Sequence, residues 1–382
     1  MTHDGNHTSP PIGHCRSCGS DLFSHVIDLG HQPSGTSFPL LDDPRTEPTY
    51  PVDLWRCDRC GLLQLGDRFS QIEEEISGVR SATHAAHAKS GTEALISELN
   101  LQPGMTYAHT RSPHGDGWEV ELEAAGLLPA RKDQPADLVL DIFGVMHSEN
   151  FDHDFGETLE KMAPNGYFVI ETQDALQLIS QGEFATIRVG HPLYFNAHSL
   201  ISALQRHGFA PISCSTTAAH GGALKLVAAH EGSADASVAA RLTAEVAAGV
   251  GPGGDLSGIA QRMISTKSKL LDFLHSQQEA GVHVAGYGAP SRGVGLLNWL
   301  GVTSDLLPYT ADLSPAKQGR RIPGTDIPIV SPAELILRRP DIVLILNYDM
   351  APEVRRGLAE LDDHGTRFFL PMPEPREMPD LS

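Results

Sequence analysis

The sequence has no long apolar run and no surplus of positive charge. Its longest apolar stretches, such as Ile342–Leu346, have the length of a strand and fall far short of the ~20 residues that a membrane-spanning helix needs. Asp and Glu (48) outnumber Lys and Arg (28), which gives a formal net charge of −20. No Lys/Arg block is present that could displace counterions from a nucleic-acid backbone. We therefore expect no membrane span and no nucleic-acid partner, although a local basic pocket for a small phosphorylated ligand remains compatible with this charge.

The N-terminal segment lacks the apolar stretch of a signal peptide, and the chain as a whole has only five cysteines. Residues 1–14 are polar and contain Pro10 and Pro11, so we predict a disordered tail there and a cytoplasmic protein. Five cysteines in 382 residues do not form a disulfide framework. Cys214 stands alone, and we interpret it as a small buried apolar residue.

The other four cysteines form two near-identical C-x-x-C-G turns. Such a turn points two thiolates at one place, and the glycine that follows (Gly19 or Gly61) supplies the backbone freedom that the turn needs. Two turns offer four soft ligands, which is the closed tetrahedral set of a structural zinc. Because no position stays open for water, this zinc is expected to be structural rather than catalytic. The predicted ligands are Cys15, Cys18, Cys57 and Cys60.

Alternating strand and helix patterns follow the cysteine region in two blocks. The first block extends from Met105 to Ala229 and the second from Val282 to Leu370, and in both the alternation predicts a parallel, doubly wound sheet. An Ala/Gly-rich stretch before a helix over 259–278 is interpreted as a linker. The predicted domains are a tail (1–14), a zinc-binding module (15–75), a first α/β domain (76–230), a linker (231–258) and a second α/β domain (259–382).

Several motifs resemble one enzyme family. They are "LWRCDRCGLLQL", the segment around His147, "APNGYFVIE", "HGGALKL" and "GYGAPSRGVGLLNWLG…YTADLSPAKQGRRIPGTDIPI". Together they look like the sugar-nucleotide C-methyltransferases of deoxysugar pathways, with the resemblance covering about residues 15–375. The resemblance implies an α/β protein of secondary-metabolite or antibiotic biosynthesis. Its expected order is a small zinc-binding β module, a class I methyltransferase-like Rossmann domain and a C-terminal Rossmann-like domain.

The segment that corresponds to the family's methyl-donor loop departs from the family pattern. Relatives carry E-x-G-S-N-D-G after the first strand of this domain, whereas this chain keeps only Gly115, Asp116 and Gly117 of that loop. About ten residues separate Leu127 from Asp137, too few for the strand, helix and strand that a class I methyltransferase places there. The first α/β domain is therefore expected to be truncated, with a degenerate site for S-adenosylmethionine.

The segment that corresponds to the family's catalytic residues is altered as well. Relatives carry Tyr-His-Glu-His, thought to deprotonate the carbon beside a sugar ketone, and the matching segment here is Arg188-Val189-Gly190-His191. His191 keeps the last position of the motif, and His147 matches a second active-site histidine. The candidate acid/base residues are therefore His147 and His191, and Arg188 is a candidate for binding a carboxylate or phosphate.

The C-terminal block keeps the family pattern. Gly286–Gly293 follows a predicted strand and opens a helix, which is the arrangement that holds a phosphate on backbone N–H groups. The resemblance implies that this domain helps to hold a nucleotide sugar, and that Arg292 takes the place of a family lysine. The candidate substrate-binding residues are Tyr287, Ser291, Arg292, Lys317 and Arg320 here, and His220, Gly221 and Gly222 in the first α/β domain.

Three hypotheses about function stay open at this point. The first is a divergent family member that binds a nucleotide-sugar-like ligand and performs a step other than ordinary methyl transfer, using His147 and His191 as acid and base. The second is an active S-adenosylmethionine-dependent sugar C-methyltransferase. The third is a non-catalytic binding or scaffold protein. A homodimer or a complex with a partner enzyme is also possible, and a divergent member of the first kind could serve as the partner of an active enzyme.

Overall fold

The computed structural model describes residues 10–67, 82–110 and 117–379, and within them the chain divides into two compact units. These units differ from the domains expected from sequence, because the chain between the two cysteine turns is shared between them. The first unit consists of Met1–Val26, Leu54–Ser180 and His191–Leu256, and the second of Ile27–Asp53, Gln181–Gly190 and Ser257–Ser382.

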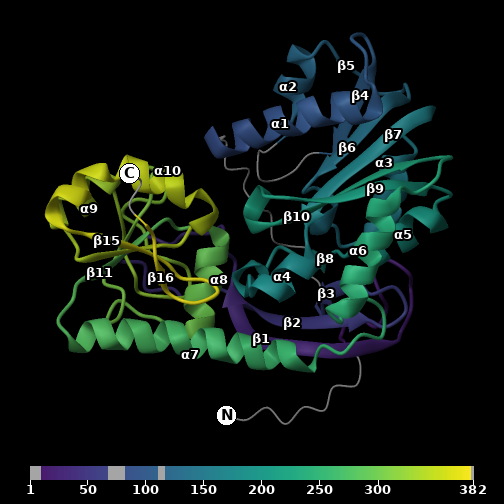
Figure 1. Ribbon diagram of the computed structural model, residues 1–382. Helices are drawn as coiled ribbons and strands as arrows, with labels where there is room; N and C mark the ends of the chain where they lie inside the picture. The colour runs from purple at the N-terminus through teal and green to yellow at the C-terminus, as the bar shows by residue number, and fades with distance from the viewer. Residues whose placement is uncertain (1–9, 68–81, 111–116, 380–382) are drawn as a thin grey trace. The chain divides into compact units, whose positions relative to one another are not determined.

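A six-stranded sheet forms the centre of the first unit (Figure 1), in the order β5-β4-β6-β7-β10-β9. Its strands are β4 (Thr106–Thr110), β5 (Leu128–Pro129), β6 (Ala136–Ile142), β7 (Met162–Gln173), β9 (Ala210–Thr217) and β10 (Ala223–Ala229). Its helices are α1 (Ala82–Leu99), α2 (Glu119–Ala124), α3 (Phe151–Leu159), α4 (Ala175–Gln181), α5 (Ala197–Arg206) and α6 (Ala236–Ala247), with 3₁₀ turns at Val145–His147 and Ala219–Gly221.

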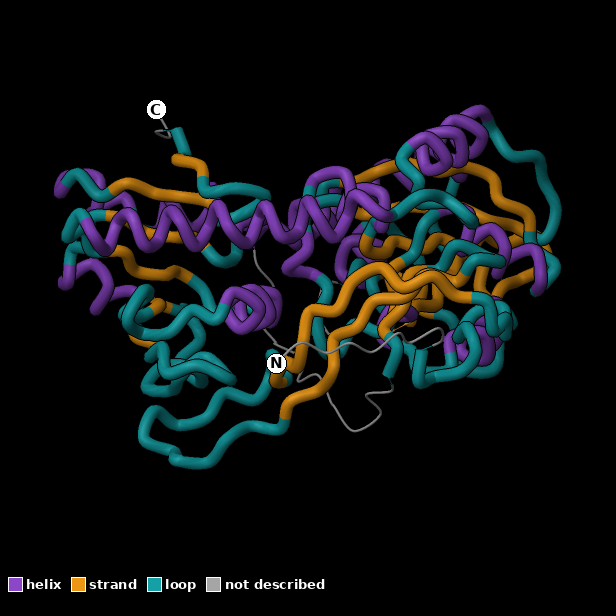
Figure 2. The backbone as a smooth tube through the Cα atoms, turned by 90° about the horizontal axis from the view of Figure 1, so that it is seen from below, coloured by secondary structure: helices purple, strands orange, loops and turns teal. Residues whose placement is uncertain are grey.

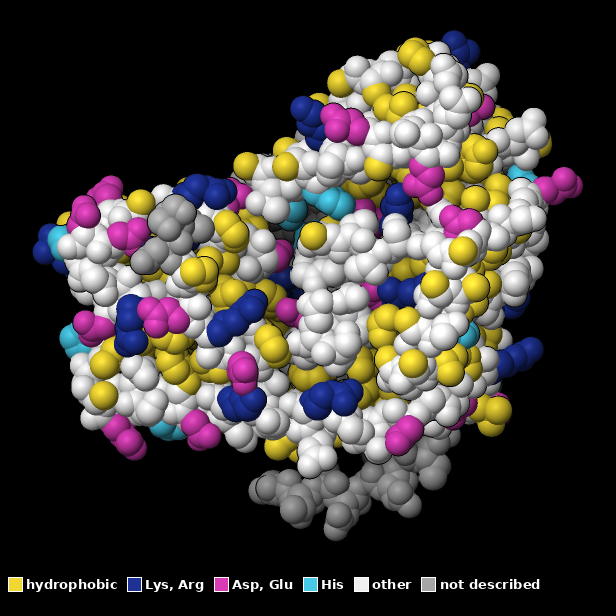
Figure 3. Space-filling model, in the orientation of Figure 1, with side chains coloured by type: hydrophobic (Ala, Val, Ile, Leu, Met, Phe, Trp, Pro, Cys, Tyr) yellow, Lys and Arg dark blue, Asp and Glu magenta, His cyan; other side chains and the backbone are white. Residues whose placement is uncertain are grey.

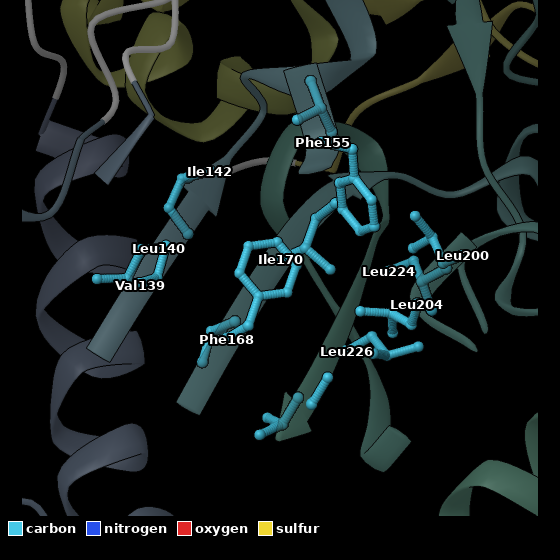
Figure 4. Close-up of a cluster of buried hydrophobic side chains, with 14 of the residues drawn as sticks. Val139, Leu140, Ile142, Phe155, Phe168, Ile170, Leu200, Leu204, Leu224 and Leu226 are labelled. Carbon is cyan, nitrogen blue, oxygen red and sulfur yellow. The ribbon is translucent and has the colours of Figure 1, made fainter. Parts of the chain in front are cut away.

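The core of the first unit lies between this sheet and its helices (Figure 4). The apolar run at the end of β6 is buried almost completely, as expected for a strand covered on both faces. Helix α5 begins at a capping box between Asn196 and Ser199, and its apolar residues recur at helical spacing, so that Leu200 and Leu204 face the sheet.

The expectation of an all-parallel sheet is wrong for β10. Strands β4, β5, β6 and β7 are parallel, but β10 is antiparallel to both β7 and β9. Only the short turn Ala219–Gly221 connects β9 to β10, and a connection this short joins antiparallel neighbours. The length argument is confirmed: between Leu127 and Asp137 the chain holds the two-residue strand β5 and a turn.

The stretch that we interpreted as a linker contains α6, which belongs to the first unit. Helix α6 packs on β9 and α5 (Figure 1), and Asp235 caps its N-terminus. Arg241 lies between Asp174 and Glu245, and both of these carboxylates are fully buried. Residues 236–247 are therefore part of a folded core.

A four-stranded sheet, ordered β1-β2-β3-β8, carries the cysteine turns. Strand β3 pairs antiparallel with both β2 and β8, so residues next to the second cysteine turn are joined to residues some 130 positions later in the chain. The predicted disordered tail is only partly described: Ile12 donates its backbone N–H to Gly66, so residues 10–14 are ordered, and residues 1–9 lie outside the described part. The strands are β1 (Phe23–Pro33), β2 (Thr49–Cys57), β3 (Leu63–Leu65) and β8 (Leu193–Tyr194).

The second unit also contains a six-stranded sheet, ordered β13-β12-β11-β14-β15-β16, in which β16 alone is antiparallel to its neighbour. The predicted second alternation is confirmed, and Figure 2 shows α7 as one continuous helix. The strands are β11 (Val284–Tyr287), β12 (Thr310–Ala311), β13 (Ile329–Val330), β14 (Ile342–Ile345), β15 (Arg367–Leu370) and β16 (Arg376–Glu377), and the helices are α7 (Ser257–Glu279), α8 (Ser291–Leu300), α9 (Pro332–Arg338) and α10 (Ala351–Gly357), with 3₁₀ turns at Phe184–Thr186, Tyr348–Met350 and Ala359–His364.

Among the described residues, no helix is both long enough and apolar enough to cross a membrane. On the face shown in Figure 3, Lys and Arg side chains are scattered among acidic ones.

Candidate functional site

The four cysteines of the two C-x-x-C turns come together in the first unit. The sulfur atoms of Cys15 and Cys60 are 3.7 Å apart and those of Cys18 and Cys57 are 3.5 Å apart, and all four lie within 4.8 Å of one another. A tetrahedron with ~2.3 Å zinc–sulfur bonds has edges of roughly 3.8 Å, so the set fits a zinc ion. The glycine after each turn has a positive φ, 67° at Gly19 and 79° at Gly61, as predicted.

The close packing of the four cysteine side chains shifts the pKa values of their thiols. Hydrogen bonds from Cys15, and then from the other two thiols, hold the pKa of Cys18 far below its usual value. The same close contacts raise the pKa of Cys60, first through Cys15. Four thiolates this close repel one another, and a divalent soft cation offsets that repulsion, which agrees with a closed structural zinc site.

His147 and His191 lie against each other in the first unit. Their ring centroids are 4.6 Å apart, and the rings meet edge to face at 87°. His147 ends the 3₁₀ turn that follows β6, and its backbone N–H donates to Gly144. His191 is only 5% exposed and stands between Gly190 and Pro192, just before β8. The two histidines that the sequence selected, 44 positions apart, therefore form one pair.

Arg188 belongs to the other compact unit. It lies in the Gln181–Gly190 segment of the second unit, is buried, and donates a hydrogen bond to the carbonyl of Val189 at 3.0 Å. A Cβ added at Gly295 would come within 3.5 Å of the Arg188 Cβ, so the residue packs beside α8. Arg188 therefore lies in the second unit, three positions before His191 in the chain.

His220, Gly221 and Gly222 form the turn between β9 and β10. His220 has a left-handed φ of 48°, and its ring contacts Phe143 (centroids 4.5 Å apart) and His84 (5.0 Å). Gly222 has a φ of 131°, and a Cβ there would come within 3.0 Å of the Gln177 side chain. Close backbone approach was expected here, and the group that approaches Gly222 is a side chain of the protein itself.

A histidine–carboxylate pair that the sequence analysis missed lies at the carboxyl end of β7. The Nε2 atom of His87 is 2.9 Å from an Oε of Glu171, whose side chain is fully buried, and the Thr217 hydroxyl donates to the other Oε. His84 and His87 are three residues apart on α1 and therefore share a face. Because 84 positions separate His87 from Glu171, the sequence does not predict that the two side chains meet. The one available signal was an acidic residue near the end of a buried strand.

Of the predicted donor loop, only Gly117 falls within the described residues, and Gly115 and Asp116 lie outside them. Gly117 stands just before α2, and a Cβ added there would collide with the Glu119 carboxylate. Strand β5, next to β4 in the sheet, ends at Pro129 and is followed by Ala130. No carboxylate therefore stands directly after this strand.

In the second unit, the glycine-rich loop connects β11 to α8. Asp312, just after β12, accepts a hydrogen bond from the backbone N–H of Ala289 in this loop at 2.7 Å. The ammonium of Lys317 lies 2.9 Å from the carbonyl oxygen of Ala289 and 3.7 Å from Asp312. Tyr287 ends β11 and is buried, which raises its pKa to about 12. Lys317 thus contacts the loop that leads into α8.

Two of the predicted substrate-binding cations have partners within the second unit. Arg292 forms an ion pair with Asp349, and its guanidinium lies 4.6 Å from the centre of the Tyr348 ring. Arg320 donates to the carbonyl of Phe38 at 2.6 Å. Ser291 packs against Gly35, where an added Cβ would come within 2.7 Å of the serine Cβ. These contacts hold loops of the second unit in place.

Comparisons with known proteins match both ends of the chain. A family model described as "C-methyltransferase C-terminal domain" matches residues 218–373, and one described as "Putative zinc binding domain" matches residues 15–73. The C-methyltransferase NovU of Streptomyces niveus is 28% identical over 410 residues, which cover 96% of this chain and 97% of NovU.

Two solved structures show weaker likeness. Magnesium protoporphyrin IX methyltransferase (ChlM) from Synechocystis PCC 6803 with bound SAH is 11% identical, with a TM-score of 0.30 over 41% of this chain and 90% of that one. LepI in complex with SAM is 12% identical, with a TM-score of 0.28 over 38% of this chain and 41% of LepI. TM-scores this low establish no shared site or activity.

Proposed function

Because family models of a C-methyltransferase C-terminal domain and of a zinc-binding domain match this chain, we propose that it binds a nucleotide-sugar-like ligand and moves a proton at a carbon beside the ketone of that ligand. His147 and His191 act as the acid and the base. The product is the ketone epimerised at that carbon, and ordinary methyl transfer no longer takes place.

The contact between His147 and His191 is the observation that carries this proposal. An imidazole has an unperturbed pKa near ~6.5, so one ring of a pair can accept a proton while the other donates one at neutral pH. In the proposed step the base takes the proton as the C–H bond breaks, the electron pair moves into a C=C bond, and the acid donates a proton to the ketone oxygen, which gives an enol. Return of a proton to either face of that carbon restores the ketone.

Two features of the chain support the loss of ordinary methyl transfer. Strand β5 has only two residues, and Ala130 follows it where methyltransferases of this fold place an acid for the ribose hydroxyls. Next to His191, Val189 and Gly190 replace the first histidine and the glutamate of the family's Tyr-His-Glu-His segment. S-adenosylmethionine would therefore lack its usual ribose partner, and the catalytic segment differs from that of the methyl-transferring relatives.

The second unit supports binding of a phosphorylated ligand. The backbone N–H groups at the start of α8 and the Lys317 ammonium stand beside the same glycine-rich loop, and both favour an anion. Lys317 and Ser291 are the residues we assign to phosphate binding. Arg292 and Arg320 support them by holding loops.

An active S-adenosylmethionine-dependent C-methyltransferase is the second candidate function. The nearly full-length similarity to NovU favours it. Both functions begin with removal of a proton beside a ketone, and they differ in what reaches the resulting carbanion.

Hydrogen–deuterium exchange at the substrate separates the two candidates. We would incubate the protein in D₂O with a thymidine-diphosphate 4-keto sugar and follow the carbon-bound protons by NMR, with and without S-adenosylmethionine. We expect exchange without the donor, and His147→Gln or His191→Gln should lower its rate about 10²- to 10³-fold. His153→Gln, on an exposed side chain of α3, is the matched control.

Each outcome of this experiment decides between the readings. A product heavier by one methyl group in the presence of the donor would establish the methyltransferase instead. Tight binding of the sugar nucleotide without exchange or methylation would refute the proposed reaction and favour a binding or scaffold role.

A further inference from the structure

Arg16 is a buried cation inside the first cysteine turn. It stands between Cys15 and Cys18, and its side chain is 1% exposed. A buried guanidinium is tolerated only where its donors are satisfied, and each group that satisfies it is thereby held in place. The partners of Arg16 therefore indicate which segments the first cysteine turn organises.

One set of contacts leads from Arg16 to His191. A terminal nitrogen of Arg16 donates to the carbonyl of Leu65 in β3 at 2.6 Å. The backbone N–H of the same residue, Leu65, donates to the carbonyl of Pro192 at 2.9 Å, and Pro192 directly follows His191. Pairing of β3 with β8 continues this connection. Two consecutive hydrogen bonds thus join the guanidinium to the residue next to one histidine.

The other set leads from Arg16 to His147. Its Nε lies 3.0 Å and a terminal nitrogen 2.9 Å from the same Oε of Glu149, two residues after His147. The backbone carbonyl of Arg16 also accepts from the N–H of Asp152, at the start of α3. The loop that carries His147 is therefore tied to the cysteine turn through both the side chain and the backbone of Arg16.

We propose that Arg16 is a positioning residue that sets the mutual orientation of His147 and His191. This proposal rests on the proposed function, because both concern the pair of His147 and His191. One planar guanidinium reaches both loops at fixed angles, and the neighbouring zinc ligands hold its backbone, so the metal site and the histidine pair form one rigid assembly. A lysine cannot reproduce this, because its single ammonium lacks the forked geometry. A misplacement of ~1 Å at a reacting group can cost a factor of about 10² in rate.

The test compares Arg16→Gln and Arg16→Lys with Arg206→Gln. Arg206 also bonds the first cysteine turn, through Ser17, and bonds Asp152, but none of these bonds reaches β3 or Glu149. The readout is the ¹⁵N and ¹³C NMR signals of the histidine rings in the zinc-loaded protein without substrate, assigned with His147→Gln and His191→Gln. Zinc content is measured on every sample.

We expect both Arg16 variants to shift the ring signals of His147 and His191 while zinc stays bound, and Arg206→Gln to leave them in place. The rate of proton exchange into the sugar nucleotide should fall about 10²-fold in Arg16→Gln with a nearly constant KM. Unchanged ring signals in a folded, zinc-loaded Arg16→Gln would overturn the proposal.

A second variant covers the case in which Arg16→Gln does not fold. Glu149→Gln removes the charge that Arg16 meets beside His147 and leaves the cysteine turn intact. It should shift the His147 signal more than the His191 signal, and an unmoved His147 signal would overturn the proposal. Because these signals are read without substrate, a wild-type protein that shows no exchange would refute the proposed reaction and leave this test decisive.

Discussion

The two compact units use similar sheets but hold their loops by different means. Each contains a six-stranded, mostly parallel sheet with loops at the carboxyl ends of its strands. In the first unit, the loops that carry His147 and His191 are tied to a cysteine cluster that fits zinc. In the second unit, ion pairs such as Arg292–Asp349 and Arg321–Glu47 hold the loops in place. A cation in a family motif is therefore not by itself evidence of a ligand contact.

Metal removal should produce the largest difference between the units. Structural zinc contributes on the order of 10 kcal/mol in zinc-finger peptides, so we expect a strong chelator, or Cys60→Ser, to abolish cooperative unfolding of the first unit. Amide hydrogen exchange read by mass spectrometry should show loss of protection in β3 and β8. Protection in β11 and β14 should stay.

The second unit is the internal control for that experiment. Equal loss of protection in both units would show that their stabilities are coupled, and unchanged protection in β3 would show that the cysteine cluster contributes little to the fold.

Removing one buried cation from each unit should give the next largest difference. Arg241→Met leaves two fully buried carboxylates, Asp174 and Glu245, and should cost about 3–5 kcal/mol of unfolding free energy. Arg292→Met leaves one, Asp349, and should cost about 1–3 kcal/mol. Urea unfolding measures both values. A larger loss for Arg292→Met would reverse our ranking of the two networks.

The smallest effect concerns Cys214, whose burial raises its pKa to about 12. Below that pH the native thiol stays protonated, so at pH 8 iodoacetamide should alkylate it about 10³-fold more slowly than in the unfolded chain. The reaction should accelerate only as the pH approaches 12 or as the first unit opens after chelation. Mass spectrometry of the alkylated peptides measures the rate, and rapid labelling of the zinc-loaded protein at pH 8 would contradict the buried position of Cys214.

Most of the fold could be predicted from local patterns in the sequence. The two C-x-x-C-G turns were enough to predict the cysteine cluster. The ligand types, their spacing and the glycines with positive φ can all be read within a few residues of each turn. Strand and helix periodicity located nearly every element of the second unit. It could not supply the direction of β10, because apolar periodicity is the same in both directions.

Long-range pairing was the part that sequence could not supply. His87, the partner of Glu171, is 84 positions away, and no pattern in the sequence around His87 predicts this contact. Likewise, the Ala/Gly-rich composition of 231–258 suggested a linker and concealed α6. Two local signals were present there, the capping Asp235 and the i, i+4 pair of Arg241 and Glu245.

The interleaved order of the two units has a consequence for synthesis of the protein. Residues 27–53 leave the ribosome early, yet they belong to the same compact unit as residues 257–382. At about 5–20 residues per second, translation of the ~200 residues between them takes roughly 10–40 s. During that time residues 27–53 cannot pack against residues 257–382. The second unit is therefore completed only after residues 257–382 have emerged from the ribosome. A shortened gene beginning at codon 257 would encode a chain that lacks this segment altogether.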